Sequence, residues 1–146
     1  MITLDTIRKP VTAELEAFDG FVDRQFTAEG ELLADMLRYA LSSRGKGIRP
    51  LLVMLSAAMN SPVEGAAKGR RVHLAAMLVE MIHVASLIHD DVIDESDTRR
   101  GRPSANARWQ SHKAVILGDF ILARNMNIGL SSGQFDLVTH VCGSMA

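Results

Sequence analysis

Three aspartates lie close together in the sequence, at positions 90, 91 and 94. Because successive residues of an α-helix turn by about 100°, Asp90 and Asp94 would share one helix face, with Asp91 beside them. Like charges repel, and the C-terminal end of a helix disfavours anions, so a cation is needed there. Mg²⁺ commonly uses one or two carboxylates together with substrate phosphates. The spacing favours Asp90 and Asp94 as Mg²⁺ ligands, and the alternative is a solvated acidic helix end paired with the nearby arginines.

A second group of charges lies upstream, in residues 45–50 (GKGIRP). Lys46 and Arg49 stand three residues apart beside flexible glycines, at the start of a predicted helix. Backbone N–H groups at a helix start attract anions, and Lys and Arg side chains bind phosphate. This segment is a candidate anion site, although basic residues at a turn are more commonly only solvated.

A histidine lies on the same helix face as the acidic group. His83 precedes Asp90 by seven residues, or two helical turns, and so lies deeper toward the core. It could donate a hydrogen bond to a phosphate, or it could be an ordinary core histidine. Glu80 and His83 also match the Glu-x-x-His element of di-iron bundles. No second copy of that element occurs in the sequence, which argues against a di-iron centre.

The elements that must position these groups are helical. Good helix formers dominate the stretches between the prolines, and the apolar/polar alternation of a half-buried strand is not sustained anywhere. We therefore predict an all-α chain without strands, in which Gly20, Gly45 and Ser61–Pro62 mark breaks between helices. The helices are predicted over residues 3–19, 23–42, 48–60, 66–94, 111–131 and 134–144.

The predicted helix over residues 66–94 carries the acidic group at its C-terminal end. It is apolar around much of its circumference, as expected of a helix buried among others, and should be the central helix. Its apolar stretch, Leu74–Ile88, is interrupted by Glu80 and His83. That stretch is shorter than the roughly 20 residues that span a bilayer, so no transmembrane helix is expected.

The composition excludes several classes of protein. The 146 residues hold 16 basic and 17 acidic side chains, a net charge of −1, which argues against a nucleic-acid partner. One cysteine, Cys142, cannot form an internal disulfide framework or a Cys-rich zinc site. Charges interrupt the apolar stretch that an N-terminal signal peptide needs, so a cytoplasmic protein is expected. With 47% hydrophobic residues, the chain is predicted to form one globular domain.

Taken in order, the motifs resemble those of one enzyme family. Residues 45–50, residues 83–94 and residues 98–101 (TRRG) resemble trans-isoprenyl diphosphate synthases. Residues 104–109 and 118–120 resemble the long-chain polyprenyl members of that family, such as octaprenyl diphosphate synthases. The acidic segment is similar to the first aspartate-rich (DDxxD) motif of the family.

The resemblance implies a fold and an extent. The fold is an antiparallel helical bundle of the isoprenoid synthase type, truncated here to about its first six helices. The second aspartate-rich motif and the later lysine-bearing segment of the family have no counterpart in this sequence. We therefore expect residues 1–146 to be the N-terminal part of a single polyprenyl synthetase domain, with little or no turnover by the isolated chain.

The resemblance also implies a reaction, the Mg²⁺-dependent condensation of isopentenyl diphosphate with an allylic prenyl diphosphate to give a trans-polyprenyl diphosphate. Asp90 and Asp94 would coordinate Mg²⁺ that bridges the allylic diphosphate, with Asp91 in support. Arg99 would contact the same diphosphate. The residues implied in isopentenyl diphosphate binding are Lys46, Arg49, His83 and Arg100.

Two small residues precede the aspartates. Ala85 lies five residues before Asp90 and is followed by Ser86. By analogy with long-chain synthases, small side chains lining the cavity below the acidic site suggest a product longer than farnesyl. The alternative is that Ala85 and Ser86 simply allow close helix packing.

Two other classes of function stay open. The chain could be a non-catalytic subunit that binds prenyl diphosphates or a full-length synthase and alters its product. It could instead be a helical interaction module whose acidic end is incidental.

Apolar residues of the predicted helix 111–131 should be exposed and promote self-association, in line with the homodimers typical of the family. These residues are Ile116, Leu117, Phe120 and Ile121.

Overall fold

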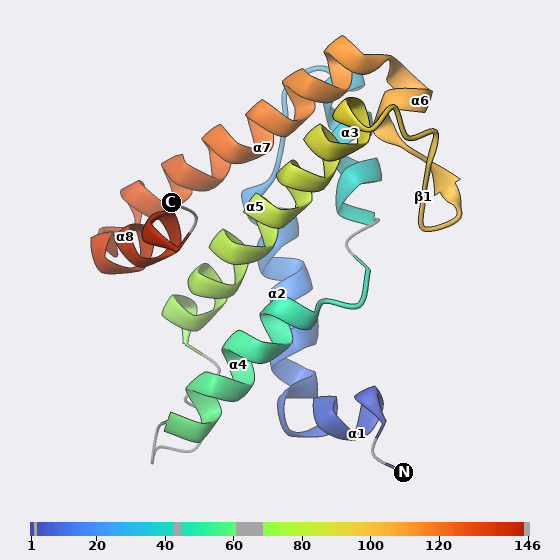
Figure 1. Cartoon of the computed structure of the whole chain (residues 1–146). Coiled ribbons are helices and arrows are strands. Elements are labelled where there is room, and N and C mark those ends of the chain that lie inside the picture. The colour runs from blue at the N-terminus through green and yellow to red at the C-terminus, as the bar shows by residue number, and fades with distance from the viewer. Residues whose placement is uncertain (2, 43–44, 61–68, 145–146) are drawn as a thin grey trace.

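A computed structural model describes residues 1, 3–42, 45–60 and 69–144, which are predominantly helical (Figure 1). The predicted all-α class is confirmed. The helical elements are α1 (Leu4–Arg8), the 3-10 turn η1 (Lys9–Val11), α2 (Thr12–Gln25), α3 (Glu31–Ser42), α4 (Ile48–Asn60), α5 (Arg70–Ile93), α6 (Ala105–Trp109), α7 (Ser111–Ser131) and α8 (Phe135–Gly143). The predicted break at Ser61–Pro62 lies outside the described residues, as do residues 66–68 of the predicted central helix.

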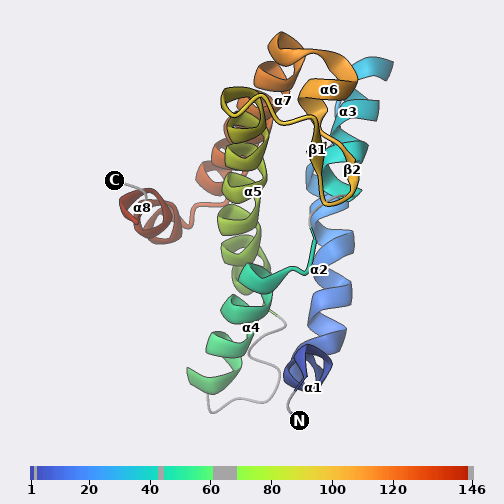
Figure 2. The ribbon, with the colours of Figure 1, turned by 45° about the vertical axis from the view of Figure 1, so that its right-hand side comes forward.

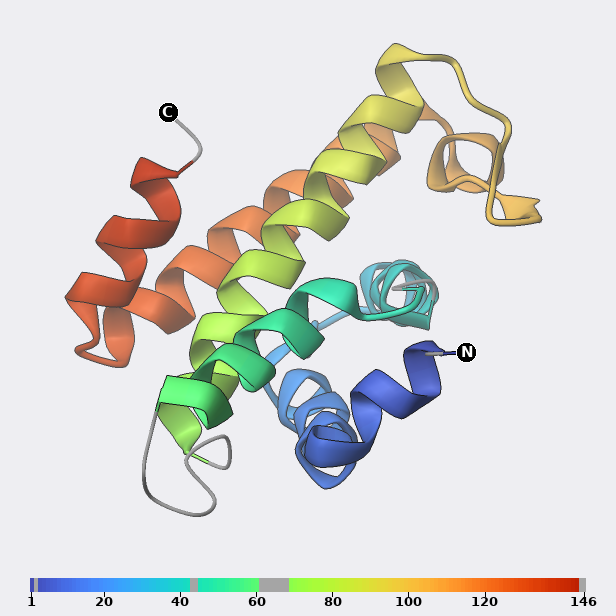
Figure 3. The ribbon, with the colours of Figure 1, turned by 60° about the horizontal axis from the view of Figure 1, so that its bottom comes forward.

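Helix α5 is the centre of the described bundle, as its apolar circumference predicts. It runs antiparallel to α7 along most of its length, and α4 packs against it as well (Figures 1 and 3). The helix is long and apolar enough to cross a membrane by length and composition, a test that the core helix of a bundle also passes. Its buried apolar residues are Leu74, Ala76, Met77, Leu78, Met81, Val84, Ala85 and Ile88.

The helices differ from the prediction between residues 95 and 110. Helices α4 and α7 have the predicted bounds, and α8 differs from its prediction by one residue at each end. The absence of strands is wrong, because β1 (Thr98–Arg99) and β2 (Arg102–Pro103) form a short antiparallel hairpin, and α6 follows it. These elements are too short for a periodic pattern to reveal them.

The helix break predicted at Gly20 is also wrong. Helix α2 continues through Gly20 to Gln25 and buries Phe21 and Val22 beyond the glycine. Burial of these two side chains outweighs the helix penalty of a glycine, about 1 kcal/mol. The chain instead turns between α2 and α3, where Gly30 has a φ of 89°.

Part of the α7 face that was expected to be exposed is buried. Leu117 and Ile121 have no exposed surface and belong to the core, so their predicted exposure is wrong. Phe120 is half-buried, whereas Ile116 is 60% exposed, as predicted. Positions four residues apart share one helix face, so Leu117 and Ile121 face the bundle together.

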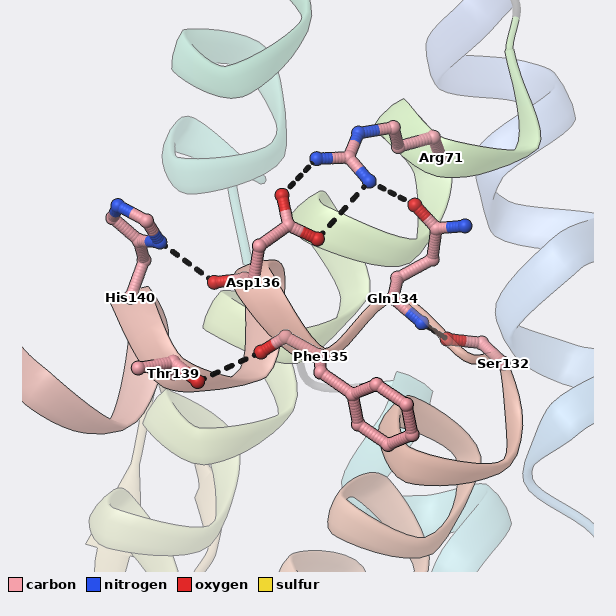
Figure 4. Close-up of polar contacts among 7 residues, drawn as sticks. All are labelled: Arg71, Ser132, Gln134, Phe135, Asp136, Thr139 and His140. Carbon is pink, nitrogen blue, oxygen red and sulfur yellow. Dashed lines mark hydrogen bonds and ion pairs between the residues drawn. The ribbon is translucent and has the colours of Figure 1, made fainter.

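Polar contacts hold α8 to the start of α5 (Figure 4). Arg71 of α5 donates to the carboxylate of Asp136 and to the side-chain oxygen of Gln134. The hydrogen bond to Asp136 raises the pKa of Arg71, and the same bond lowers the pKa of Asp136. Both charged side chains are more than half exposed, so the pair orients α8 more than it stabilises the fold.

Candidate functional site

The three aspartates lie at the C-terminal end of α5, which a left-handed residue closes. Glu95 has a φ of 50°. The Ser96 N–H donates to the Asp91 carbonyl at 2.9 Å, and the Glu95 N–H donates to the Val92 carbonyl at 3.3 Å. These two bonds form a Schellman motif, which ends the helix and leaves Asp94 at the C-cap position.

Asp91 and Arg99 form an ion pair at this helix end. Asp91 is 3% exposed, and Arg99 donates from Nε to Oδ2 at 2.7 Å and from Nη2 to Oδ1 at 2.6 Å. The hydrogen bond to Asp91 raises the pKa of Arg99. Asp91 therefore orients Arg99, whereas Asp90 and Asp94 are exposed.

The hairpin presents Arg99 on β1 and Arg100 at its turn. Arg99 pairs with Arg102 across the strands. The turn residues Arg100 and Gly101 have φ values of 53° and 75°, and positive φ at both positions is what a type I′ turn requires. Glycine adopts this conformation freely, whereas Arg100 is strained in it. Such strain is concentrated at functional sites, which singles out Arg100.

The basic segment lies against this hairpin. A Cβ atom at Gly45 would overlap the guanidinium of Arg100, so the lack of a side chain there allows Arg100 to approach the backbone. Arg8, at the end of α1, donates to the Lys46 carbonyl and holds the same segment from the N-terminal side. Gly45 thus allows close contact between the basic segment and the hairpin, which are distant in the sequence.

His83 lies among arginines from both segments. Burial lowers the pKa of His83, and the positive charges of Arg49, Arg100 and Arg99 lower it further, while Asp90 opposes the shift. His83 is therefore neutral near pH 7 and can donate an N–H without adding positive charge. The structure brings five of the predicted site residues together here: Arg49, His83, Asp90, Arg99 and Arg100.

A small cavity of about 50 Å³ lies at this junction. His83, Asp91, Arg99 and Arg100 contribute polar groups to its lining, and apolar residues of α3 and α5 contribute much of the rest. A few polar groups converge there on an apolar wall, as they do in small-molecule sites, but the cavity is much smaller than the roughly 300–1,000 Å³ of such sites.

Three other predicted residues lie apart from this cavity. Lys46 is exposed and borders a different cavity, of about 330 Å³, together with Arg8 and Glu80. Ala85 is fully buried and Ser86 is exposed, and neither lines the cavity beside His83. The burial of Ala85 agrees with the close-packing alternative, and a role of Ala85 and Ser86 in product length stays a prediction.

The carboxylates at this end of α5 suit a hard divalent cation. Asp90 and Asp94 are exposed and one turn apart, and carboxylate oxygens are ligands that Mg²⁺ prefers. Among the described residues, no group of three or more His, Cys, Asp or Glu side chains is arranged to hold a metal ion. Two carboxylates fit a Mg²⁺ ion whose remaining ligands are water and substrate phosphates.

Three residues with no predicted role also shape the site: Tyr39, Ser104 and Arg8. The Ser104 side chain donates to the Ser96 carbonyl at 2.6 Å and caps α6 by accepting from the Ala107 N–H at 3.0 Å. A serine before a short helical stretch could have revealed this cap. Nothing local marks Tyr39 or Arg8, whose bonding partners lie 64 and 38 residues away in the sequence.

Comparison with protein families and known sequences gives consistent matches. The polyprenyl synthetase family model matches residues 30–145. The chain is 35% identical over 137 residues to the octaprenyl diphosphate synthase of Escherichia coli, covering 94% of this chain and 41% of that protein. It is 37% identical over 113 residues to heptaprenyl diphosphate synthase component 2 of Geobacillus stearothermophilus, covering 77% of this chain and 34% of that protein.

A solved structure agrees with these matches. The polyprenyl synthase from Caulobacter crescentus, complexed with calcium and isoprenyl diphosphate, superposes with a TM-score of 0.77 at 25% identity. The alignment covers 90% of this chain and 38% of that one. The chain spans about a third to two fifths of the length of the curated relatives that it matches. With the motifs, the helical fold and these matches in agreement, the chain belongs to the polyprenyl synthetase family.

Proposed function

We propose that this chain forms a diphosphate-binding part of a Mg²⁺-dependent trans-prenyltransferase, which condenses isopentenyl diphosphate with an allylic prenyl diphosphate. The observation that carries the proposal is the gathering of Arg49, Arg99 and Arg100 around a neutral His83, next to Asp90. Three cations around a neutral donor suit a multivalent anion such as a diphosphate. The relatives named as polyprenyl diphosphate synthases support this assignment.

The proposed roles follow from where charge develops. Asp90 and Asp94 would hold Mg²⁺, which when bound supplies charge neutralisation at the allylic diphosphate. Arg99, oriented by Asp91, would bind that diphosphate more strongly as the allylic C–O bond breaks and its negative charge grows. The double bond of isopentenyl diphosphate then attacks the allylic carbocation, a carbon–carbon bond forms and a proton is lost. Buried helix faces would keep water away from the cation.

The second diphosphate would occupy the basic side of the junction. Arg49, Arg100 and His83 would hold isopentenyl diphosphate, and Lys46 would reach it from the exposed start of the basic segment, residues 45–50.

We also propose a long-chain product, which the heptaprenyl and octaprenyl names of the relatives support. A cytoplasmic location remains part of the proposal.

Calorimetric titration of farnesyl diphosphate into the 146-residue chain, with and without Mg²⁺, tests the proposal. We expect Mg²⁺-dependent binding that Asp90→Asn and Arg99→Ala weaken by about tenfold or more. Glu29→Gln, at an exposed loop position between α2 and α3, is the matched charge control and should bind as the unaltered chain does. Equal affinity in Asp90→Asn and in the unaltered chain would refute the proposed metal site. In a separate assay we expect little or no elongation with isopentenyl diphosphate.

The relative named heptaprenyl diphosphate synthase component 2 favours a second candidate, a subunit role in a heteromeric synthase. Exposed apolar side chains on α4 and α7, Leu52 and Ile116 among them, offer contact area for a partner subunit or a second copy of the chain. We therefore also propose that the chain associates, as a homodimer or with a synthase. Adding it to an active polyprenyl diphosphate synthase tests the subunit role, which an unchanged product length would contradict.

A further inference from the structure

Tyr39 of α3 contacts the hairpin that carries Arg99 and Arg100. Its hydroxyl donates to the carbonyl of Pro103, the last residue of β2, at 2.7 Å. The guanidinium carbon of Arg102, also on β2, lies 4.3 Å from the centre of the Tyr39 ring. Figure 2 shows the hairpin beside α3, although 64 residues separate Tyr39 from Pro103 in the sequence.

The same ring contacts α6, the helix that follows the hairpin. The guanidinium carbon of Arg108 lies 4.6 Å from the centre of the Tyr39 ring and 4.5 Å from the Trp109 ring. Tyr39 and Trp109 meet edge to face, with ring centroids 5.1 Å apart and planes at 86°. Aromatic rings attract one another in this geometry and attract cations over their faces. One side chain thus joins α3, β2 and α6.

The hairpin needs such support. Each strand has two residues, and the turn between them holds Arg100 in a strained conformation. An isolated two-stranded hairpin is at best marginally stable in water. The Asp91–Arg99 pair fixes β1 to α5, and Tyr39 fixes β2 to α3, where Arg102 also donates to the Ser42 hydroxyl at 3.1 Å.

We propose that Tyr39 is a positioning residue for the diphosphate site. Its side chain holds the hairpin so that Arg99 and Arg100 stay beside the acidic end of α5. This inference rests on the proposed function, since it concerns the same arginines. Tyr39 lines the small cavity together with His83 and both arginines, so movement of the hairpin away from Tyr39 would open the site. Prepositioned arginines bind an anion more tightly because less ordering is needed on binding.

The test uses the 146-residue chain and two substitutions at one position. Tyr39→Phe removes the hydroxyl and its bond to Pro103 and keeps the ring, whereas Tyr39→Leu also removes the ring contacts with Arg102, Arg108 and Trp109. Met36→Ala is the matched control. Met36 is buried on the same helix, three residues before Tyr39, and borders a cavity against α7, so its truncation lowers stability and leaves the Tyr39 side chain in place.

Two quantities are measured for each variant: the affinity for inorganic pyrophosphate with Mg²⁺, by calorimetry, and the hydrogen exchange of the backbone amides of residues 98–102. We expect Tyr39→Leu to weaken the affinity by about five- to tenfold and to speed hairpin exchange. Tyr39→Phe should retain most of the affinity. Met36→Ala should lower thermal stability and leave the affinity unchanged. Fluorescence of Trp109, the only tryptophan, should change in Tyr39→Leu because its edge contact is lost.

The outcomes separate this inference from the function on which it rests. Undiminished affinity in Tyr39→Leu overturns the positioning role, and so do equal losses of affinity in Tyr39→Leu and Met36→Ala. An unaltered chain that binds no pyrophosphate refutes the proposed function instead. Hairpin exchange then decides the support role of Tyr39, because unchanged exchange in Tyr39→Leu overturns it and faster exchange supports it.

Discussion

The three aspartates of the acidic segment differ in burial, so the same substitution should affect them differently. Asp91→Asn removes the anionic partner of Arg99 from a pair whose carboxylate is 3% exposed. We expect the free energy of unfolding to fall by about 1–3 kcal/mol, a moderate loss because solvent partly screens Arg99. Asp90→Asn and Asp94→Asn remove exposed charge from a helix C-terminus and should leave stability unchanged or slightly higher. Urea denaturation of the three variants checks this, and equal losses would contradict it.

Two glycines of the basic segment allow a matched comparison. Gly45 and Gly47 have φ values of 78° and 57°, so an alanine is strained at either position, by about 1 kcal/mol. A Cβ at Gly45 would overlap the Arg100 guanidinium, whereas a Cβ at Gly47 meets no atom within 4 Å. Gly45→Ala should therefore weaken diphosphate binding beyond its effect on stability, and Gly47→Ala should lower stability alone. Calorimetric titration with pyrophosphate and Mg²⁺ distinguishes them, and equal binding by both variants would rule out the Arg100 contact as the cause.

Among the elements, helix α5 ends at a left-handed position that glycine would occupy with less strain than Glu95 does. Glu95 occupies the left-handed position of the Schellman motif, where glycine is usual. Glu95→Gly should raise the free energy of unfolding by about 1 kcal/mol, because glycine avoids the steric cost of a positive φ. Glu95→Ala removes the same charge and keeps the Cβ, so it should bring no comparable gain. A gain of equal size in both variants would assign the effect to charge, and thermal denaturation of the pair measures it.

A helix or strand could be predicted where the residues that determine it lie within it or beside it in the sequence. Helix formers and prolines are local features, so α4 and α7 were predicted to the residue. Gly20 shows the limit, because its propensity argued for a break while the burial of Phe21 kept the helix intact. The hairpin depends on distant partners, such as Tyr39, which donates to its Pro103 carbonyl, and no local pattern encodes those.

The candidate site was predictable in its parts but not in its assembly. The order of the motifs indicated the family, and the helical spacing placed His83 and Asp90 on one face of α5. The pairing of Asp91 with Arg99 and the contact of Arg100 with Gly45 follow from the path of the hairpin, which the sequence did not reveal. At the scale of the whole molecule, the site is made where α5, the hairpin and the basic segment meet.

The bundle as a whole should lose stability in acid through its buried histidines. His73 of α5 is buried against the rings of Phe18 and Phe21 on α2. Burial lowers the pKa of His73, Glu14 opposes this shift and Arg24 adds to it. The unfolded chain therefore binds a proton more readily than the folded chain just below pH 6.5, the ordinary pKa of histidine. Unfolding then takes up a proton, so stability rises with pH in this range.

The free energy of unfolding should consequently fall as the pH is lowered from about 7 toward 5, and the loss should level off below the lowered histidine pKa. His83, whose pKa burial also lowers, should contribute in the same direction. His73→Gln and His83→Gln should each reduce the pH dependence, whereas His112→Gln, at an exposed position of α7, should leave it unchanged. Urea denaturation across this pH range tests the argument. A pH dependence that survives in the double variant His73→Gln/His83→Gln would show that groups other than these buried histidines control the acid stability of the bundle.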